Sequence, residues 1–150
     1  MTAIIEDASI RHVDRLYEIE MECFEKAAFT KRQIAQLLTD YNSVGLVAKE
    51  NHKVVGFVIA MIYVDRNKLS GHILTIDVSL AHRRKGIGQM LLQEVEKILK
   101  AKGVKTCHLE VREDNVAAIS LYRKFSYQKI GKLKNYYGKA DGIYLKKALT

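Results

Sequence analysis

Apolar positions along the chain change between two spacings, and this change divides the sequence into strands and helices. Alternation or short apolar runs predict strands at residues 3–6, 44–49, 54–64, 72–78, 105–111, 127–133 and 142–146. Apolar residues three or four apart predict helices that begin after Ser9, after Thr30 with its capping box to Gln33, near Gly86, and at Asp114 or Asn115. This order mixes hairpins with crossovers. We therefore expect an α/β fold with one mixed sheet of about seven strands flanked by about four helices.

The chain has 150 residues and shows no linker, low-complexity tract or internal repeat. We expect a single domain over residues 1–150. The first residues, MTAIIEDAS, carry an acidic pair where a signal peptide needs a basic start, and the apolar run at 54–64 is too short to span a bilayer. The expected location is the cytoplasm, with no membrane association.

Cysteine content argues against disulfides and a metal site, whereas the net charge leaves the type of anionic partner open. Cys23 and Cys107 are too few for a disulfide framework and form no metal-ligand spacing with the five histidines, so we expect free thiols and no metal. The net charge of +8 favours anionic partners. A nucleic acid and a small ligand with several phosphates both satisfy that charge, and composition alone does not separate them.

A basic, glycine-rich loop joins the strand predicted at 72–78 to the following helix. It reads Arg83-Arg84-Lys85-Gly86-Ile87-Gly88. The first turn of a helix leaves main-chain N–H groups unpaired, and glycine lets a phosphate approach them closely. A dinucleotide fingerprint would need a third glycine where Leu91 stands, and a Walker loop would need Gly-Lys-Ser/Thr. The alternative is a helix that starts with glycine next to a solvated basic cluster.

Two further blocks accompany this loop. Residues 109–125 read LEVREDNVAAISLYRKF, and residues 135–137 read Asn-Tyr-Tyr. Together with Arg83-x-x-Gly86-x-Gly88, these blocks resemble the GNAT superfamily of N-acetyltransferases, whose acetyl-CoA motif is Gln/Arg-x-x-Gly-x-Gly/Ala. They are most similar to the RimI-type and archaeal N-terminal (Nα) acetyltransferase branch, and the likeness covers nearly the whole chain. One departure stands at residues 24–29, FEKAAF, where RimI-type loops usually read Phe-Pro-Trp. That departure implies a differently shaped substrate pocket.

The resemblance implies the GNAT fold, acetyl-CoA as cosubstrate and a role for each matching residue. The residues implied to bind acetyl-CoA are Val78, Arg83, Arg84, Lys85, Gly86, Ile87, Gly88, Gln89, Asn115 and Tyr122. Those implied in catalysis are Glu110 as general base, Tyr122 as general acid beside the leaving sulfur, and His72 as a residue that orders a water near the amine. The residues implied to line the peptide cleft are Phe24, Phe29, Tyr136 and Tyr137.

Without the resemblance, these residues have plainer interpretations, which stay open at this point. Glu110 fits the solvated face of a strand, on which it lies with Thr106, His108 and Arg112. His72 alternates with Leu74, Ile76 and Val78 and fits a hydrogen-bonded core histidine. Tyr122 fits core packing, although a buried tyrosine hydroxyl needs a polar partner.

The chemistry of amines favours a protein N-terminus as the acceptor. Deprotonating an α-amino group at pH 7 costs about 1.4 kcal/mol, whereas a lysine costs about 4.6 kcal/mol. A single carboxylate is a plausible aid for the first task and a weak one for the second. We therefore expect acetyl transfer to a peptide or protein N-terminus, with a ribosomal protein as one candidate and no DNA partner. The alternatives are a lysine or small-amine acetyltransferase of the same fold and a basic, non-catalytic RNA- or ribosome-binding module.

Overall fold

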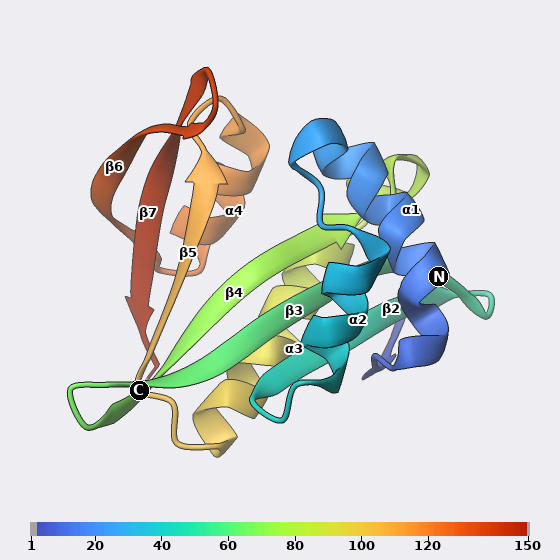
Figure 1. Ribbon diagram of the computed structural model, residues 1–150, viewed down its shortest axis with the longest axis horizontal. Helices are drawn as coiled ribbons and strands as arrows, with labels where there is room; N and C mark the ends of the chain where they lie inside the picture. The colour runs from blue at the N-terminus through green and yellow to red at the C-terminus, as the bar shows by residue number, and fades with distance from the viewer. Residues whose placement is uncertain (1–2, 150) are drawn as a thin grey trace.

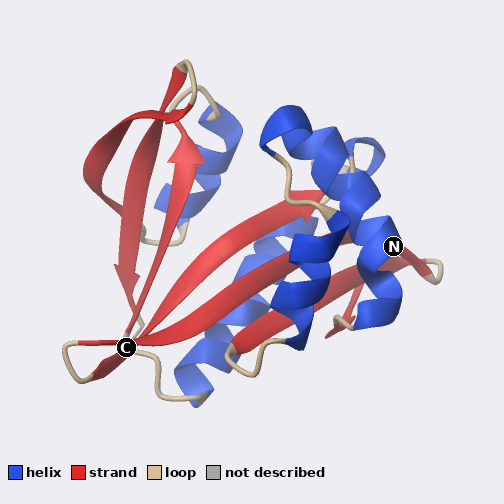
Figure 2. Cartoon of the chain, viewed as in Figure 1, coloured by secondary structure: helices blue, strands red, loops and turns tan. Residues whose placement is uncertain are grey.

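The computed structural model describes residues 3–149 and shows one mixed sheet with helices on both faces (Figure 1, Figure 2). The strands are β1 (Ile4–Asp7), β2 (Ser43–Glu50), β3 (Lys53–Asp65), β4 (Lys68–Val78), β5 (Thr106–Arg112), β6 (Gln128–Tyr137) and β7 (Ala140–Ala148). The helices are α1 (Val13–Phe24), α2 (Lys31–Thr39), α3 (Ile87–Ala101) and α4 (Val116–Lys124). The expected fold class is confirmed. Within residues 3–149, no helix combines the length and apolarity needed to cross a bilayer.

Two hydrophobic clusters lie on the two faces of the sheet. The cluster under α1 and α2 includes Leu16, Ile19, Ile34, Val47, Val54, Phe57 and Ile59. The cluster under α3 and α4 includes Val55, Val58, Leu91, Leu92, Val95, Leu99, Leu109 and Leu145. Each fully buried aliphatic or aromatic side chain contributes about 1.5–3 kcal/mol relative to exposure. The sheet is thus held from both faces, and the site lies where its strands part.

The strand order is β1-β2-β3-β4-β5-β7-β6, and β4–β5 is the parallel pair at its centre. These two strands pair over a short stretch, from Ser70–Thr106 to His72–His108. Beyond it, β4 continues along β3 as far as Val78, while β5 continues along β7 as far as Arg112. Figure 1 shows the two strands close together near the C-terminus and widely separated at their far ends. A cleft therefore opens between them.

Strand β4 does not keep the simple alternation that its sequence suggests. Its register with β3 shifts so that Leu74 is skipped, and Leu74 packs in the cluster under α1 and α2. Past the shift, Ile76 and Val78 pack against the opposite cluster, under α3. The prediction that His72 shares one face with Leu74, Ile76 and Val78 is therefore wrong. A bulge of this kind turns the residues beyond it to the other face.

Most predicted helix starts are confirmed, and two segments differ from expectation. Thr30 caps α2, because its hydroxyl accepts from the Gln33 amide at 3.1 Å while the Gln33 side chain accepts from the Thr30 amide at 2.8 Å. Residues 135–137, expected in a loop, form the end of β6. The expected loop at residues 23–29 instead begins inside α1 and continues as a 3-10 helix, Glu25–Ala27.

Candidate active site

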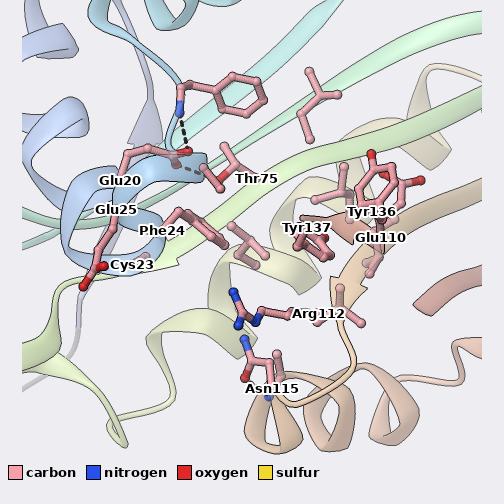
Figure 3. A pocket seen from close by; sticks show the side chains of 18 of the residues that line it. Glu20, Cys23, Phe24, Glu25, Thr75, Glu110, Arg112, Asn115, Tyr136 and Tyr137 are labelled. Carbon is pink, nitrogen blue, oxygen red and sulfur yellow. Dashed lines mark hydrogen bonds between the residues drawn. The ribbon is translucent and has the colours of Figure 1, made fainter. Parts of the chain in front are cut away.

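A cavity of about 680 Å³ lies between the separated strands β4 and β5 (Figure 3). Its walls come from the end of α1 and the turn after it, from β4 and β5, from α4 and from the tip of the β6–β7 hairpin. Seven of the residues singled out in the sequence line it: Phe24, Phe29, Glu110, Asn115, Tyr122, Tyr136 and Tyr137. They come from segments far apart in the chain, so the fold brings them into one place.

The start of α3 presents unpaired main-chain donors. Gly86 is the N-cap residue, with a left-handed φ of +80° that favours glycine. The first main-chain bond of the helix joins the Met90 amide to the Gly86 carbonyl at 3.0 Å. The amides of Ile87, Gly88 and Gln89 precede that bond and so have no carbonyl one turn back. Together with the helix dipole, they make a site for an anion.

The left-handed φ of Gly86 favours glycine at that position, whereas Gly88 has no such backbone requirement. A Cβ placed on Gly88 would meet only side-chain carbons of Leu121 and Val78, both at 3.7 Å, which is ordinary contact. A Cβ on Gly86 would meet nothing within 4 Å. Packing therefore does not demand glycine at residue 88. A bare backbone there suits the pyrophosphate of coenzyme A, which the loop was predicted to hold.

The basic side chains of the loop are partly engaged elsewhere. Arg83 folds back, donating from Nε to the Val78 carbonyl at 3.1 Å and lying 3.2 Å from Cys23 Sγ. Arg83 already donates to the Val78 carbonyl. The predicted pairing of Val78 with the pantetheine arm must therefore use the Val78 amide, or Arg83 must move. Cys23 is half-buried, and burial raises its pKa to about 11, so its thiol stays protonated.

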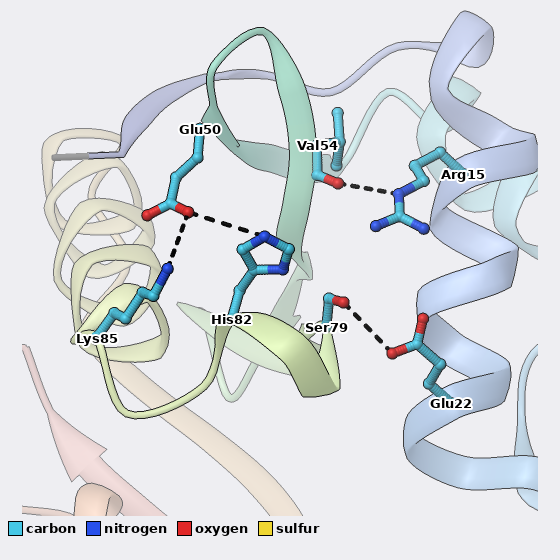
Figure 4. A network of polar contacts seen from close by, with 7 residues as sticks. All are labelled: Arg15, Glu22, Glu50, Val54, Ser79, His82 and Lys85. Carbon is cyan, nitrogen blue, oxygen red and sulfur yellow. Dashed lines mark hydrogen bonds and ion pairs between the residues drawn. The ribbon is translucent and has the colours of Figure 1, made fainter. Parts of the chain in front are cut away.

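Lys85 reaches across to the β2–β3 turn. Its ammonium lies 3.5 Å from Glu50, and His82 lies 3.9 Å from the same carboxylate (Figure 4). Arg84, with a left-handed φ of 64°, makes no ion pair with any residue that the structure describes. Of the three basic side chains, Arg84 is therefore the one available to an anion without breaking an existing contact.

Glu110 sits where β4 and β5 begin to part, held by two histidines. His72 Nε2 lies 2.7 Å from Glu110 Oε1, and His108 Nδ1 lies 3.6 Å from Oε2. The two imidazole rings stack with centroids 4.3 Å apart. Tyr63 holds the outer side of His108, with its hydroxyl 2.6 Å from Nε2. The structure thus brings the predicted Glu110 and His72 into direct contact.

This contact sets the charge of Glu110. Burial alone would raise the pKa of its carboxyl, but the close contacts with His108 and His72 outweigh burial and lower the pKa to about 2. The carboxylate is therefore ionised at neutral pH. The ligand atoms of these three residues lie within 4.8 Å of one another, a spacing that could also admit a cation. The 2.7 Å contact and the stacked rings fit a hydrogen-bonded cluster.

Helix α4 supplies Asn115 and Tyr122. The Asn115 side chain caps the helix by accepting from the Ala118 amide at 3.1 Å, so only its amide nitrogen remains for the predicted contact with the pantetheine arm. Tyr122 is buried against the cavity, and this burial raises the pKa of its hydroxyl. A tyrosine held neutral in this way keeps the proton that a general acid must donate.

Four aromatic side chains form the open side of the cleft. Phe24 and Phe29 flank the turn after α1, and Tyr136 and Tyr137 stand at the end of β6 with ring centroids 4.9 Å apart. The absence of a side chain at Gly142 on β7 lets the two tyrosines pack there, since a Cβ would lie 3.1–3.2 Å from their atoms. The predicted lining residues therefore do face one cavity.

Sequence reasoning missed five residues beside this cleft. They are Tyr63 and His108 around Glu110, and Glu20, Thr75 and Asp77 beneath the turn after α1. Glu20 did leave a signal, because it occupies the inner stripe of α1 with Leu16 and Ile19, where a carboxylate is out of place. His108 shares the polar face of β5 with Glu110. Tyr63 left none, because its contact crosses from the β3–β4 hairpin to β5.

The fold has a parallel strand pair that parts near a helix start with unpaired amides, and a carboxylate at the fork; this arrangement suits an α/β acyl-transfer domain. The chain belongs to the acetyltransferase (GNAT) family, whose sequence model matches residues 13–127. The protein is therefore an acetyltransferase.

The two similar sequences described next are both named as N-acetyltransferases. The N-alpha-acetyltransferase of Sulfolobus acidocaldarius is 35% identical over 117 residues, which cover 72% of this chain and 70% of the relative. The [ribosomal protein bS18]-alanine N-acetyltransferase of Haemophilus influenzae is 32% identical over 142 residues, covering 93% and 91%. The crystal structure of the NatC complex bound to Gag peptide and CoA superposes with a TM-score of 0.91 at 18% identity and covers 100% of both chains, which shows the shared fold.

Proposed function

We propose that this protein transfers the acetyl group of acetyl-CoA to the α-amino group of a protein N-terminus. The observation that carries the proposal is the position of the Glu110–His72 pair, at the fork of a cleft whose outer walls are aromatic. The names of the two relatives support the same acceptor, since one is an N-alpha-acetyltransferase and the other a [ribosomal protein bS18]-alanine N-acetyltransferase.

Acetyl-CoA is the acetyl donor, and we assign separate binding regions to its pyrophosphate and its pantetheine arm. The amides of Ile87, Gly88 and Gln89 and the free charge of Arg84 bind its pyrophosphate. The pantetheine arm then runs along the parted edge of β4 toward the fork. The bound thioester supplies the electrophilic carbonyl, and the chain's own residues position the amine and move its proton.

Glu110 and His72 act as one proton acceptor. A lone carboxylate with a pKa near 2 is a poor base for an ammonium near 8, because the transfer is uphill by about 8 kcal/mol. An imidazole is much closer in basicity to the amine. The ionised Glu110 contacts His72 Nε2 at 2.7 Å and orients the imidazole, as a carboxylate does in other acid–base pairs. This division of labour suits an α-amine better than the more basic amine of lysine.

Tyr122 supplies the proton for the departing thiolate. Its hydroxyl stays neutral because burial raises its pKa, and it lines the cavity from α4. In this proposal, Glu110 with His72 takes the proton from the amine, and Tyr122 gives one to the sulfur. Attack is direct, and the buried Cys107 takes no part as a nucleophile.

Three finer assignments extend the proposal. A ribosomal protein is the first acceptor to test, because the Haemophilus influenzae relative is named for one. The reaction belongs in the cytoplasm, where free thiols such as Cys23 and Cys107 persist. Residues 1–150 act as one acetyltransferase domain.

The test uses acetyl-CoA with short peptides that carry both a free N-terminus and one internal lysine. Matched peptides have the N-terminus blocked, and mass spectrometry locates the acetyl group. We expect acetylation of the α-amine and none of the blocked peptides. Acetylation of lysine in the blocked peptides would select the lysine alternative. Absence of transfer together with salt-sensitive RNA binding would select the RNA-binding alternative.

A further inference from the structure

Three polar side chains are buried between α1 and β4, beneath the turn that forms the acceptor cleft. Glu20 on α1 is 2% exposed, and Thr75 and Asp77 on β4 are 5% and 2% exposed. The Thr75 hydroxyl lies 2.9 Å from Glu20 Oε1 and 2.7 Å from Asp77 Oδ1. Figure 3 draws the contact between Glu20 and Thr75 at the base of the pocket. The mechanism above does not use any of these groups.

The hydrogen count of this cluster requires a proton on one carboxyl group. A threonine hydroxyl has one hydrogen and can donate it to one acceptor. Thr75 nevertheless lies within hydrogen-bond distance of two carboxyl oxygens. If both were ionised, one contact would join two acceptors without a hydrogen, and two buried charges would share one donor, which is costly. One of the two carboxyls therefore donates to Thr75.

The surroundings place that proton on Asp77. The second oxygen of Glu20 accepts from the Phe29 amide at 2.9 Å, a bond that favours an ionised Glu20. The second oxygen of Asp77 is buried and has no hydrogen-bond partner among the described residues. Burial, followed by the hydrogen bond and charge of Glu20, raises the pKa of Asp77 well above its ordinary value of 3.8. The hydrogen bonds thus run from Asp77 to Thr75 to Glu20, which also receives the Phe29 amide.

We propose that protonated Asp77, acting through Thr75 and Glu20, is a positioning device that ties the Phe29 side of the acceptor cleft to the strand ending at Val78. Phe29 follows the 3-10 turn, where the main chain has few other anchors, and its side chain lines the cavity. The device holds the peptide-binding wall in register with the strand along which the coenzyme lies. The role of this device in acceptor binding rests on the proposed function. The presence of a proton on Asp77 does not depend on that function.

The charge state of Asp77 depends on groups from three elements around it. Glu20 and Cys23 face it from α1, Tyr122 from α4, and Arg83 from the loop before α3. Of these, Arg83 is the cation and lowers the pKa of Asp77, but burial and Glu20 outweigh it. Because the folded-state pKa is raised, the stabilisation from Asp77 is fully present below the ordinary carboxyl pKa and is lost as pH rises through the folded value.

The proton can be observed directly in the full chain by infrared spectroscopy. A protonated carboxylic acid has a carbonyl stretch that a carboxylate lacks. We expect this band at neutral pH in the wild-type protein and its loss in Asp77→Asn, an isosteric variant whose amide still donates to Thr75. Absence of the band at neutral pH, or its persistence in Asp77→Asn, overturns the proposal. The proton can thus be found or excluded even if the protein proves to act on another substrate.

A matched pair at Thr75 tests the positioning role. Thr75→Val keeps the shape but removes the hydroxyl, whereas Thr75→Ser keeps the hydroxyl. We expect Thr75→Val and Glu20→Gln to raise the peptide KM about tenfold, with kcat and acetyl-CoA affinity within about twofold of wild type. Thr75→Ser restores the peptide KM. An unchanged peptide KM in folded Thr75→Val, or an equal rise in Thr75→Ser, overturns the role. Failure of the proposed function instead appears as absent turnover in the wild-type protein.

Discussion

The two walls of the cleft each carry a carboxyl group that is at least partly buried, and the two groups are driven to opposite charge states. On β5, Glu110 contacts two stacked imidazoles, and its pKa falls to about 2. On β4, Asp77 lies beside another carboxyl, and its pKa rises well above its ordinary value. Burial pushes both in the same direction, so the neighbours decide. The Glu110 carboxyl on β5 keeps its negative charge, whereas the Asp77 carboxyl on β4 stays neutral.

This difference separates chemistry from positioning. A charge at the fork of β4 and β5 can orient His72 and stabilise a developing cation. A neutral Asp77 serves as a hydrogen-bond donor to Thr75 and adds no further negative charge beside Glu20. Changes on the β5 side should therefore appear in kcat, and changes on the β4 side in binding or in stability.

The largest effect should follow removal of the negative charge on the β5 side. Glu110→Gln leaves His72 without its ionised partner, and we expect kcat to fall about a hundredfold, in the range of general acid–base contributions. The acetyl-CoA affinity measured by calorimetry should stay close to that of wild type. Glu113→Gln is the control, because Glu113 is an exposed partner of Lys132. Wild-type turnover in Glu110→Gln would remove this carboxylate from the mechanism.

Loss of the proton donor should have the next largest effect. Tyr122→Phe keeps the packing and removes the hydroxyl, and we expect kcat to fall tenfold or more, roughly the lower end of what a general acid contributes. Tyr127→Phe is the matched control. It also removes a buried hydroxyl, which donates to Glu96 at 2.7 Å, but lies away from the cleft lining. The control should lose stability and keep turnover. Equal kcat in Tyr122→Phe and wild type would assign the proton to another donor.

On the coenzyme side, the expected change is in affinity. Gly88→Val fills the space above the first-turn amides of α3, and we expect acetyl-CoA to bind at least about tenfold more weakly. The melting temperature should stay near that of wild type, because a Cβ at this position makes only ordinary contacts. Gly131→Val on β6, where a Cβ meets nothing within 4 Å, is the control. Undiminished binding in Gly88→Val would place the pyrophosphate elsewhere.

The smallest expected effect is on the pH dependence of stability, which tests the opposite charge states of Glu110 and Asp77. The lowered pKa of Glu110 gives stability that is present above its ordinary value of 4.5 and lost as pH falls toward 2. The raised pKa of Asp77 gives stability that is lost as pH rises above 3.8 through its folded value. Denaturant unfolding across pH should therefore show Glu110→Gln without the acid loss, which is on the order of 3 kcal/mol, and Asp77→Asn without the loss at higher pH. Parallel profiles for the two variants would contradict the opposite charge states.

Features that depend on residues close together in the sequence were predictable. The cap at Thr30, the glycine-rich start of α3 and the strand–helix order follow from residues close together in the chain. The resemblance then located Glu110, Tyr122 and the aromatic residues that line the cavity, which local patterns alone left among several interpretations.

Features that depend on contacts between distant elements were not predictable. The skipped residue Leu74 reverses the face of β4, and no pattern within that strand announces it. His108 reaches its partner Tyr63 across 45 residues of sequence, and Glu20 reaches Thr75 across 55. The engagement of Arg83 with the Val78 carbonyl likewise required the fold. Charge states decided by such neighbours are visible only once the sheet has formed.

The most direct test of the central claim is a crystal structure with a bisubstrate compound in which coenzyme A is joined through an acetyl group to the α-nitrogen of a peptide. We predict the pyrophosphate on the amides of Ile87, Gly88 and Gln89. We also predict the peptide nitrogen within hydrogen-bond reach of the Glu110–His72 pair, directly or through one water. A compound bound with that nitrogen away from the fork of β4 and β5, or with the start of α3 unoccupied, would contradict the account.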